Sequence, residues 1–396
     1  MKNEKPFMYF DNAATTMLRP EVLEAMMPYL KEQYGNPSAV YGFARAARKG
    51  VEEARKQVAD AISAQPEEIV FTASGTEANN WALSGAVEAW LQKKAKGEAT
   101  CHIITTATEH HAITDVCEWL KRRGAEITLL PVDSEGFVSL NDLKSAIRQN
   151  TILISIMWAN NEIGTIQPIA ELAAIAREKG ILFHTDAVQA VGHIPINVQE
   201  VPVDMLTMSA HKFNGPKGVG ALYIRKGVRI PSFLYGGAQE KRRRAGTENV
   251  AGIIGMGEAA ELAVAEIADE HKRLTLLRDT LIKRIEETIP NVSLNGSKKD
   301  KRLPGNVNFS FDYIEGESLL LLLDMNGCCA SSGSACSSAS LEPSHVIMAL
   351  GVPHEKAHGS IRFSLGRYST ISDIDGLMAV LPKLVAQLRE MSPLAE

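Results

Sequence analysis

The stretch Met208-Ser-Ala-His-Lys-Phe-Asn-Gly-Pro-Lys-Gly-Val-Gly220 predicts a lysine held between two buried strands. An apolar run at 201–208 leads into it, and a second strand-like run follows at 219–224. We expect Lys212, placed between a strand and a glycine-rich turn, to be partly desolvated. Desolvation lowers the pKa of the amine and favours Schiff-base chemistry. The alternative is that Lys212 is an ordinary surface lysine.

A second signal lies upstream, where Leu182-Phe-His-Thr-Asp186 is typical of a buried parallel strand that ends in an acid. Ligands of open α/β sheets bind at the carboxyl ends of the strands. Pyridoxal phosphate needs an acidic partner at its pyridine nitrogen, so that the ring works as an electron sink. Asp186 is therefore a candidate cofactor residue, although an aspartate in this place is equally compatible with capping a helix.

Short apolar runs alternate with helical patterns in the N-terminal part of the chain. The expected strands cover 68–72, 103–106, 127–131 and 151–157. The expected helices cover 20–33, 44–64, 75–91, 113–123 and 140–147. This alternation predicts an α/β fold with a mostly parallel, doubly wound sheet. The turn at 74–76, between a strand and a helix, offers backbone N–H groups and a positive dipole end to a phosphate, or simply caps the helix.

The pattern changes after residue 249. One long helical region covers 249–289, with a break expected near Glu270, and Pro290 ends it. Shorter strands and helices follow, which predicts a smaller α+β domain after a boundary around residue 260.

Composition narrows the class of protein. The chain has 396 residues, 45% of them hydrophobic, with a net charge of −5. That charge gives no reason to expect binding to nucleic acid or to an anionic membrane surface. No apolar run approaches the ~20 residues of a membrane span. The five cysteines are scattered and odd in number, so we expect reduced thiols in a cytoplasmic protein, with no metal site.

Several blocks of the sequence resemble one family. Asp186-x-x-Gln189 followed by Ser209-x-His211-Lys212 resembles the lysine site of the aminotransferase class V group of fold-type I pyridoxal phosphate enzymes. The blocks Tyr9-Phe-Asp-Asn-Ala-Ala-Thr-Thr16 and Ser360-Ile-Arg-Phe-Ser-Leu-Gly-Arg367 extend the resemblance over nearly the whole chain. Ser331-Ser-Gly-Ser-Ala-Cys336 is the most specific block. With it, the sequence resembles the cysteine desulfurases of the NifS/IscS type.

The resemblance implies a fold-type I PLP-dependent transferase with pyridoxal 5′-phosphate as its cofactor. It implies a large domain over 16–260, and a small domain in which 1–15 fold back onto 261–396. Lys212 would link the cofactor, Asp186 would face the ring nitrogen, and His110 would stack on the ring and shuttle protons. The other implied cofactor-binding residues are Gly75, Thr76, Ser209 and His211 at the phosphate, Asn161 and Gln189 at the ring hydroxyl, and Thr247 at the phosphate of a neighbouring subunit. The last of these implies a homodimer.

The resemblance also implies a reaction. Arg362, with Asn161, would bind the carboxylate of L-cysteine, because the guanidinium fork suits bidentate capture. Cys336, on a Ser/Gly-rich loop expected to be exposed and mobile, would take the sulfur as a persulfide and leave L-alanine. The sulfur would pass to an iron–sulfur scaffold or another acceptor protein, and a role of Cys336 as a transient iron–sulfur ligand stays open. Cys328 and Cys329 are expected to be small residues of a buried strand, which would compete for the persulfide if exposed.

Three alternatives remain. Two keep the same cofactor chemistry: a selenocysteine lyase, which would prefer the selenium substrate, and a class V aminotransferase, which would not need the loop of Cys336. The third is a catalytically silent binding protein on this fold, which would be marked by loss of Lys212 or Asp186. Both residues are present.

Overall fold

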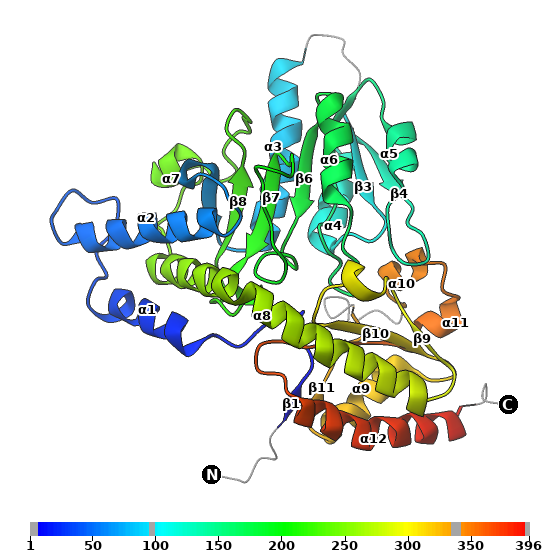
Figure 1. Ribbon diagram of the computed structural model, residues 1–396. Helices are drawn as coiled ribbons and strands as arrows, with labels where there is room; N and C mark the ends of the chain where they lie inside the picture. Colours follow the sequence, from blue (N-terminus) through cyan, green and yellow to red (C-terminus); the bar gives the residue numbers. More distant parts are fainter. Residues whose placement is uncertain (1–6, 95–99, 334–341, 393–396) are drawn as a thin grey trace.

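A seven-stranded sheet forms the centre of the larger part of the molecule (Figure 1). The computed structural model describes residues 7–94, 100–333 and 342–392. The strands lie in the order β2 (Ile69–Thr72), β8 (Gly220–Ile224), β7 (Met205–Ser209), β6 (Leu182–Asp186), β5 (Thr151–Ser155), β3 (His102–Thr106) and β4 (Glu126–Leu130). Only β8 runs antiparallel to its neighbours, and the other pairings are parallel. The predicted α/β fold with a mostly parallel sheet is confirmed.

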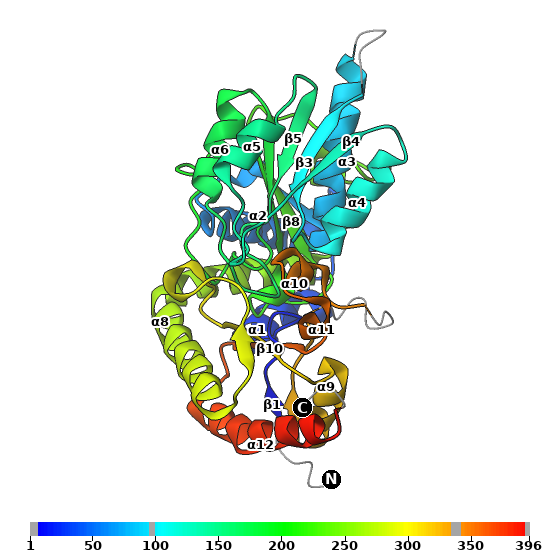
Figure 2. The ribbon, with the colours of Figure 1, turned by 90° about the vertical axis from the view of Figure 1, so that its right-hand side faces the viewer.

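Helices cover both faces of this sheet (Figure 2). One face packs against α3 (Gly75–Lys93) and α4 (His111–Lys121). The other packs against α2 (Ala44–Asp60), α5 (Leu140–Ala146) and α6 (Ile169–Glu178). Because both faces are covered, a strand such as β7 is buried at every residue, which explains why it carries apolar side chains on both faces.

The smaller part has its own sheet and its own core. The sheet order is β12 (Ser360–Ser364), β10 (Asn306–Phe311) and β9 (Val292–Leu294), all antiparallel. A core of buried residues joins these strands to α9 (Gly316–Met325) and α12 (Ile371–Glu390). The short strand β1 (Met8–Tyr9) pairs in parallel with β11 (Cys328–Cys329). The N-terminal arm thus lies in this part, while the domain boundary at residue 260 stays a prediction.

Shorter elements complete the chain. They are α1 (Pro20–Lys31), α7 (Gln239–Arg242), α10 (His345–Ala349), α11 (His354–Ala357) and single 3₁₀ turns at Pro66–Glu68, Ala210–Lys212 and Lys299–Lys301. Among the described helices, none has both the length and the apolar character that a membrane crossing requires.

The helix α8 (Val250–Thr288) is continuous, so the expected break near Glu270 is wrong. Its buried residues fall into two groups, one up to Ala260 and one from Leu274 onward. Each group belongs to a different core. The intervening turns are polar because the helix crosses there between the two parts of the molecule (Figure 1), not because the helix ends.

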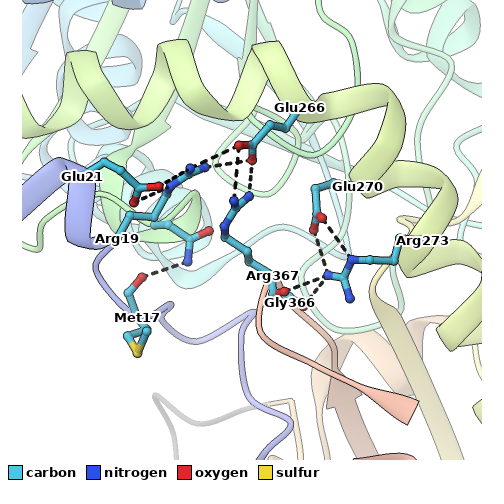
Figure 3. Close-up of polar contacts among 9 residues, drawn as sticks. Met17, Arg19, Glu21, Glu266, Glu270, Arg273, Gly366 and Arg367 are labelled. Carbon is cyan, nitrogen blue, oxygen red and sulfur yellow. Dashed lines mark hydrogen bonds and ion pairs between the residues drawn. The ribbon is translucent and has the colours of Figure 1, made fainter.

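The charges on that crossing segment make ion pairs (Figure 3). Glu266 accepts from Arg19 just before α1 and from Arg367 just after β12. One turn further along the helix, Glu270 pairs with Arg273, which also donates to the Gly366 carbonyl at 3.1 Å. These contacts connect α8 to the segment just before α1 and to the segment just after β12.

Candidate active site

A cavity of about 290 Å³ opens at the carboxyl ends of the parallel strands. Among the residues that the structure describes, all the predicted site residues except Thr247 line it. They are Gly75, Thr76, His110, Asn161, Asp186, Gln189, Ser209, His211, Lys212 and Arg362. Its position agrees with the rule that open α/β sheets bind ligands at this edge.

Lys212 enters the cavity from the 3₁₀ turn that follows β7. Its Nζ donates to the carbonyls of Ala13 at 2.6 Å and Ala14 at 2.8 Å. Nε2 of the half-buried His193 lies 2.9 Å from the Lys212 carbonyl. Lys212 is half-buried, and its amine is held by backbone oxygens of the N-terminal arm.

Asp186 ends β6 and is buried. Its Oδ2 accepts a hydrogen bond of 2.7 Å from Nδ2 of Asn79, and its Oδ1 accepts one of 3.0 Å from the Val188 N–H. Asn79 was not predicted. A signal for it exists, because it stands four residues after Gly75 on α3 and so shares that residue's face of the helix.

The N-terminus of α3 and the end of β7 form a cradle for an anion. Ser74 caps the helix, and its Oγ accepts from the Glu77 N–H at 3.1 Å. Gly75 comes next and is packed closely, since a Cβ there would lie 2.9 Å from Cγ2 of Val188. His211 lies on the same wall of the cavity, and burial, followed by Lys212 and Lys217, lowers its pKa to about 4. The cradle thus offers neutral donors and a helix dipole.

His110 is the N-cap of α4, and its Nδ1 accepts from the Ala112 N–H at 3.0 Å. With Nδ1 used as an acceptor, a neutral ring carries its proton on Nε2. Burial lowers the pKa of His110, Asp186 opposes that shift, and Lys212 adds to it. The neutral form is therefore favoured at physiological pH.

Arg362 projects from β12 into the cavity. Its Nη1 donates to the Asn161 carbonyl at 3.0 Å and its Nη2 to Oδ1 of Asp11 at 2.8 Å. Gln189, whose Nε2 donates to the Ala13 carbonyl at 2.9 Å, lies on the same arm-facing side. The small and large parts of the molecule therefore both contribute to one site.

Comparison with known proteins decides the family. The Aminotransferase class-V family matches residues 8–377.

The chain belongs to this family.

The "Cysteine desulfurase IscS" of Dictyoglomus turgidum is 58% identical over 393 residues, which cover 99% of this chain and 97% of that protein. A solved structure of a "NIFS-LIKE PROTEIN" aligns with a TM-score of 0.89 and 37% identity, covering 96% of this chain and all of that one. The structure "SspA in complex with cysteine" aligns with a TM-score of 0.80 and 34% identity over 92% of this chain and 100% of that chain. The predicted membership among cysteine desulfurases of the NifS/IscS type is confirmed.

In this member of the family, two buried carboxyl groups of the cavity were not predicted. Glu109 accepts at Oε1 from the Met157 N–H at 2.8 Å and from Thr106 Oγ1 at 2.9 Å. Burial raises its pKa to about 8. Glu162 accepts from the Ser344 hydroxyl, and burial raises its pKa as well. Glu109 directly precedes the predicted residue His110 in the sequence, and Glu162 directly follows Asn161. That sequence adjacency could have indicated that both acids lie near the cavity.

His345 is a third residue that was not predicted. It begins α10, lines the cavity, and its ring lies 5.0 Å from that of His111. Its Nε2 lies 2.9 Å from the Glu109 carbonyl. No local pattern marked it, because α10 reaches the cavity only through the tertiary fold.

One predicted residue that the structure describes lies away from the cavity. Thr247 is exposed and does not line it. Cys336 lies outside the described residues, and the nearest described residue before it, Gly333, lines the cavity. Of the two other cysteines in question, Cys328 is buried in β11 as predicted and Cys329 is half-buried.

Proposed function

We propose that this chain uses pyridoxal 5′-phosphate to convert L-cysteine to L-alanine, with the sulfur retained as a persulfide on Cys336. The observation that carries the proposal is that Lys212, Asp186 and Arg362 line one cavity together with Gly333. An amine, a carboxylate at the end of a strand and a guanidinium are the three groups that an amino-acid substrate and this cofactor require. The cysteine-bound structure of a similar protein supports the choice of substrate.

The residues present fit the cofactor. The N-terminus of α3 with Ser209 and His211 suits a phosphate. The fixed carboxylate of Asp186 suits a protonated ring nitrogen. Beside it, Oδ1 of Asn79 is buried and has no hydrogen-bond partner among the described residues. When bound, pyridoxal phosphate supplies an electron sink that stabilises negative charge at the substrate Cα.

The chain's own residues then have separate tasks. Arg362 holds the substrate carboxylate, with Asn161 at its side. Nζ of Lys212 removes the proton from the substrate Cα, and Nε2 of the neutral His110 is placed to move a proton to or from the substrate. Asp186, whose carboxylate accepts a hydrogen bond from Asn79, would hold a negative charge toward the ring nitrogen of the cofactor. Gln189, which donates to the Ala13 carbonyl of the N-terminal arm, would hydrogen-bond the ring hydroxyl.

The sulfur step balances without an external oxidant. The Cys336 thiolate attacks the substrate sulfur, a sulfur–sulfur bond forms, and the bond between the substrate Cβ and its sulfur breaks. The electron pair of that bond stays on the carbon, which takes a proton and becomes the methyl group of L-alanine. The enzyme thiol becomes a persulfide, and its outer sulfur passes to an acceptor thiol.

We further propose a cytoplasmic homodimer that supplies an iron–sulfur scaffold or another acceptor protein. Thr247 is exposed and does not line the cavity of its own chain, which leaves it available to contact a neighbouring subunit. The segment near α1 exposes large apolar side chains, with Tyr34 at 73% and Val40 at 100% exposure, and such surfaces support a subunit interface. The described cysteines are all free thiols, which supports a reducing compartment.

Mass spectrometry of the protein after brief exposure to L-cysteine tests the proposal, with alanine measured in parallel. We expect one added sulfur on the peptide of Cys336 and an equal amount of alanine. The variant Cys336→Ala is expected to release alanine far more slowly. If it releases alanine at the unsubstituted rate, Cys336 is not the acceptor. If a keto acid consumes an amino donor instead, the chemistry is transamination.

A further inference from the structure

The guanidinium of Arg362 is buried, and only some of its N–H donors have hydrogen-bond partners among the described residues. Its side chain is 2% exposed. Of its five N–H donors, one on Nη1 is taken by the Asn161 carbonyl and one on Nη2 by Asp11. Nε has no hydrogen-bond partner among the described residues. A buried donor without a partner costs free energy, and Nη1 and Nη2 each carry a second N–H beyond the one used in these bonds. Because Arg362 lines the cavity, its guanidinium is suited to an acceptor that enters there.

Asp11 is itself fixed from several directions. Its backbone bridges to Ser364, two residues beyond Arg362 on the same strand. Its carbonyl accepts from the Ala14 N–H at 3.0 Å and the Thr15 N–H at 3.4 Å. The carboxylate therefore stands at a defined place, and because the guanidinium is planar, one fixed contact on Nη2 constrains the direction of the whole fork.

We propose that Asp11 is a positioning residue that aims the unpaired edge of the Arg362 guanidinium at the α-carboxylate of the amino acid. This inference rests on the proposed function, which gives Arg362 the substrate carboxylate. Asp11 acts through Arg362 and does not touch the substrate. Its effect is therefore on affinity for carboxylate-bearing ligands, and the later sulfur transfer is left unchanged.

Two variants separate orientation from charge. Asp11→Asn keeps an oxygen that accepts from Nη2, so the fork stays aligned. Asp11→Ala removes the contact and lets the guanidinium turn. Tyr9→Phe serves as the matched control, because it removes the 2.8 Å hydrogen bond from Tyr9 to the Thr15 carbonyl on the same arm and leaves both hydrogen bonds of the Arg362 guanidinium in place.

The test measures dissociation constants of L-alanine and of L-alanine methyl ester on the cofactor-loaded proteins, from the change in visible absorption. For Asp11→Ala we expect affinity for L-alanine to fall on the order of tenfold, the scale of one charge-assisted hydrogen bond. Affinity for the ester, which has no carboxylate charge, stays within about twofold. Asp11→Asn recovers most of the loss, and Tyr9→Phe matches the unsubstituted protein. Turnover of L-cysteine should show the same change in KM with kcat little altered.

Equal losses for acid and ester in Asp11→Ala would overturn the proposal, because they would mean a general disturbance of the arm. Unchanged affinity for both ligands would overturn it as well. Failure of the proposed function would be observed in a different experiment, because the unsubstituted protein would then form no alanine from L-cysteine. The titration still decides the role of Asp11 in that case, because L-alanine binding requires no sulfur transfer.

Discussion

Nδ2 of Asn79 donates a hydrogen bond of 2.7 Å to Oδ2 of Asp186, and both side chains are buried. The bond joins the second turn of α3 to the end of β6. The helix α3, whose N-terminus is suited to an anion, thus also holds the carboxylate of Asp186. Anion cradle and carboxylate are therefore held at a constant separation.

Removing this bond should weaken cofactor binding. We expect Asn79→Ala to lower the affinity for pyridoxal phosphate by about 10- to 100-fold, because a hydrogen bond to a charged group contributes about 1.5–3 kcal/mol. Dialysis followed by visible absorption measures the retained cofactor. Asn80→Ala is the matched control, since the Asn80 side chain donates to the Thr76 carbonyl of its own helix. Equal retention in the two variants would contradict the role given to Asn79.

Glu109 should make stability depend on pH. Burial raises its pKa from 4.5 to about 8 in the folded protein. Between those values the folded state binds more protons than the unfolded state, so this group's stabilisation is lost as the pH rises through the window. The free energy of unfolding changes through this group by at most about 1.4 kcal/mol per pH unit. Glu109→Gln mimics the neutral acid, and we expect its melting temperature to fall less steeply from pH 5 to pH 8. Parallel melting curves for the two proteins would argue against a neutral Glu109.

Glu266 should contribute more to stability than its neighbour Glu21. It is shared by Arg19 and Arg367, and Arg19 is almost fully buried. Glu266→Gln leaves that buried cation with one exposed partner, so we expect a loss of about 1–2 kcal/mol, reduced from the range for fully buried pairs because Glu266 is partly exposed. Glu21→Gln is expected to cost less than about 0.5 kcal/mol. Urea unfolding of both variants measures the difference, and equal losses would refute the ranking.

The turn at α7 stores backbone strain. Glu240, Lys241 and Arg242 have φ values of 47°, 56° and 66°, in the left-handed region that favours glycine. The Glu240 carboxylate is held there by two 2.8 Å contacts with Arg55. We expect Arg242→Gly to stabilise the protein by about 1 kcal/mol in urea unfolding. In contrast, Arg177→Gly within α6 should destabilise it by a similar amount. A loss of stability in Arg242→Gly would show that its side chain matters more than its backbone.

Some of the site could be predicted from local sequence because its residues follow strands. Lys212 and Asp186 stand where apolar runs end, and the sheet brings such ends together. Asn79 was not predicted, because its partner Asp186 is set by how α3 packs on the sheet. The pair of Asp11 and Arg362 is 351 residues apart in the chain, and no periodicity relates them.

The fold was predictable where the burial of an element produces a simple pattern of apolar residues. Strands buried on both faces are mostly apolar, and α2, which buries one face, shows apolar residues at helical spacing. The error at Glu270 arose because one helix serves two cores, so its apolar face is interrupted while its backbone is not. The spacing of apolar residues in the sequence does not distinguish one helix that contacts two cores from two helices separated by a break.

The pairing of β1 with β11, and of Asp11 with Ser364, has a consequence for the order of folding. Met8 pairs with Cys328, and Asp11 with Ser364, so each contact closes a loop of more than 300 residues. Closing a long loop costs chain entropy before the contact can offset it. The central sheet needs neither pairing, so we expect it to form first and the side of the pocket built by Asp11 and Arg362 to form last.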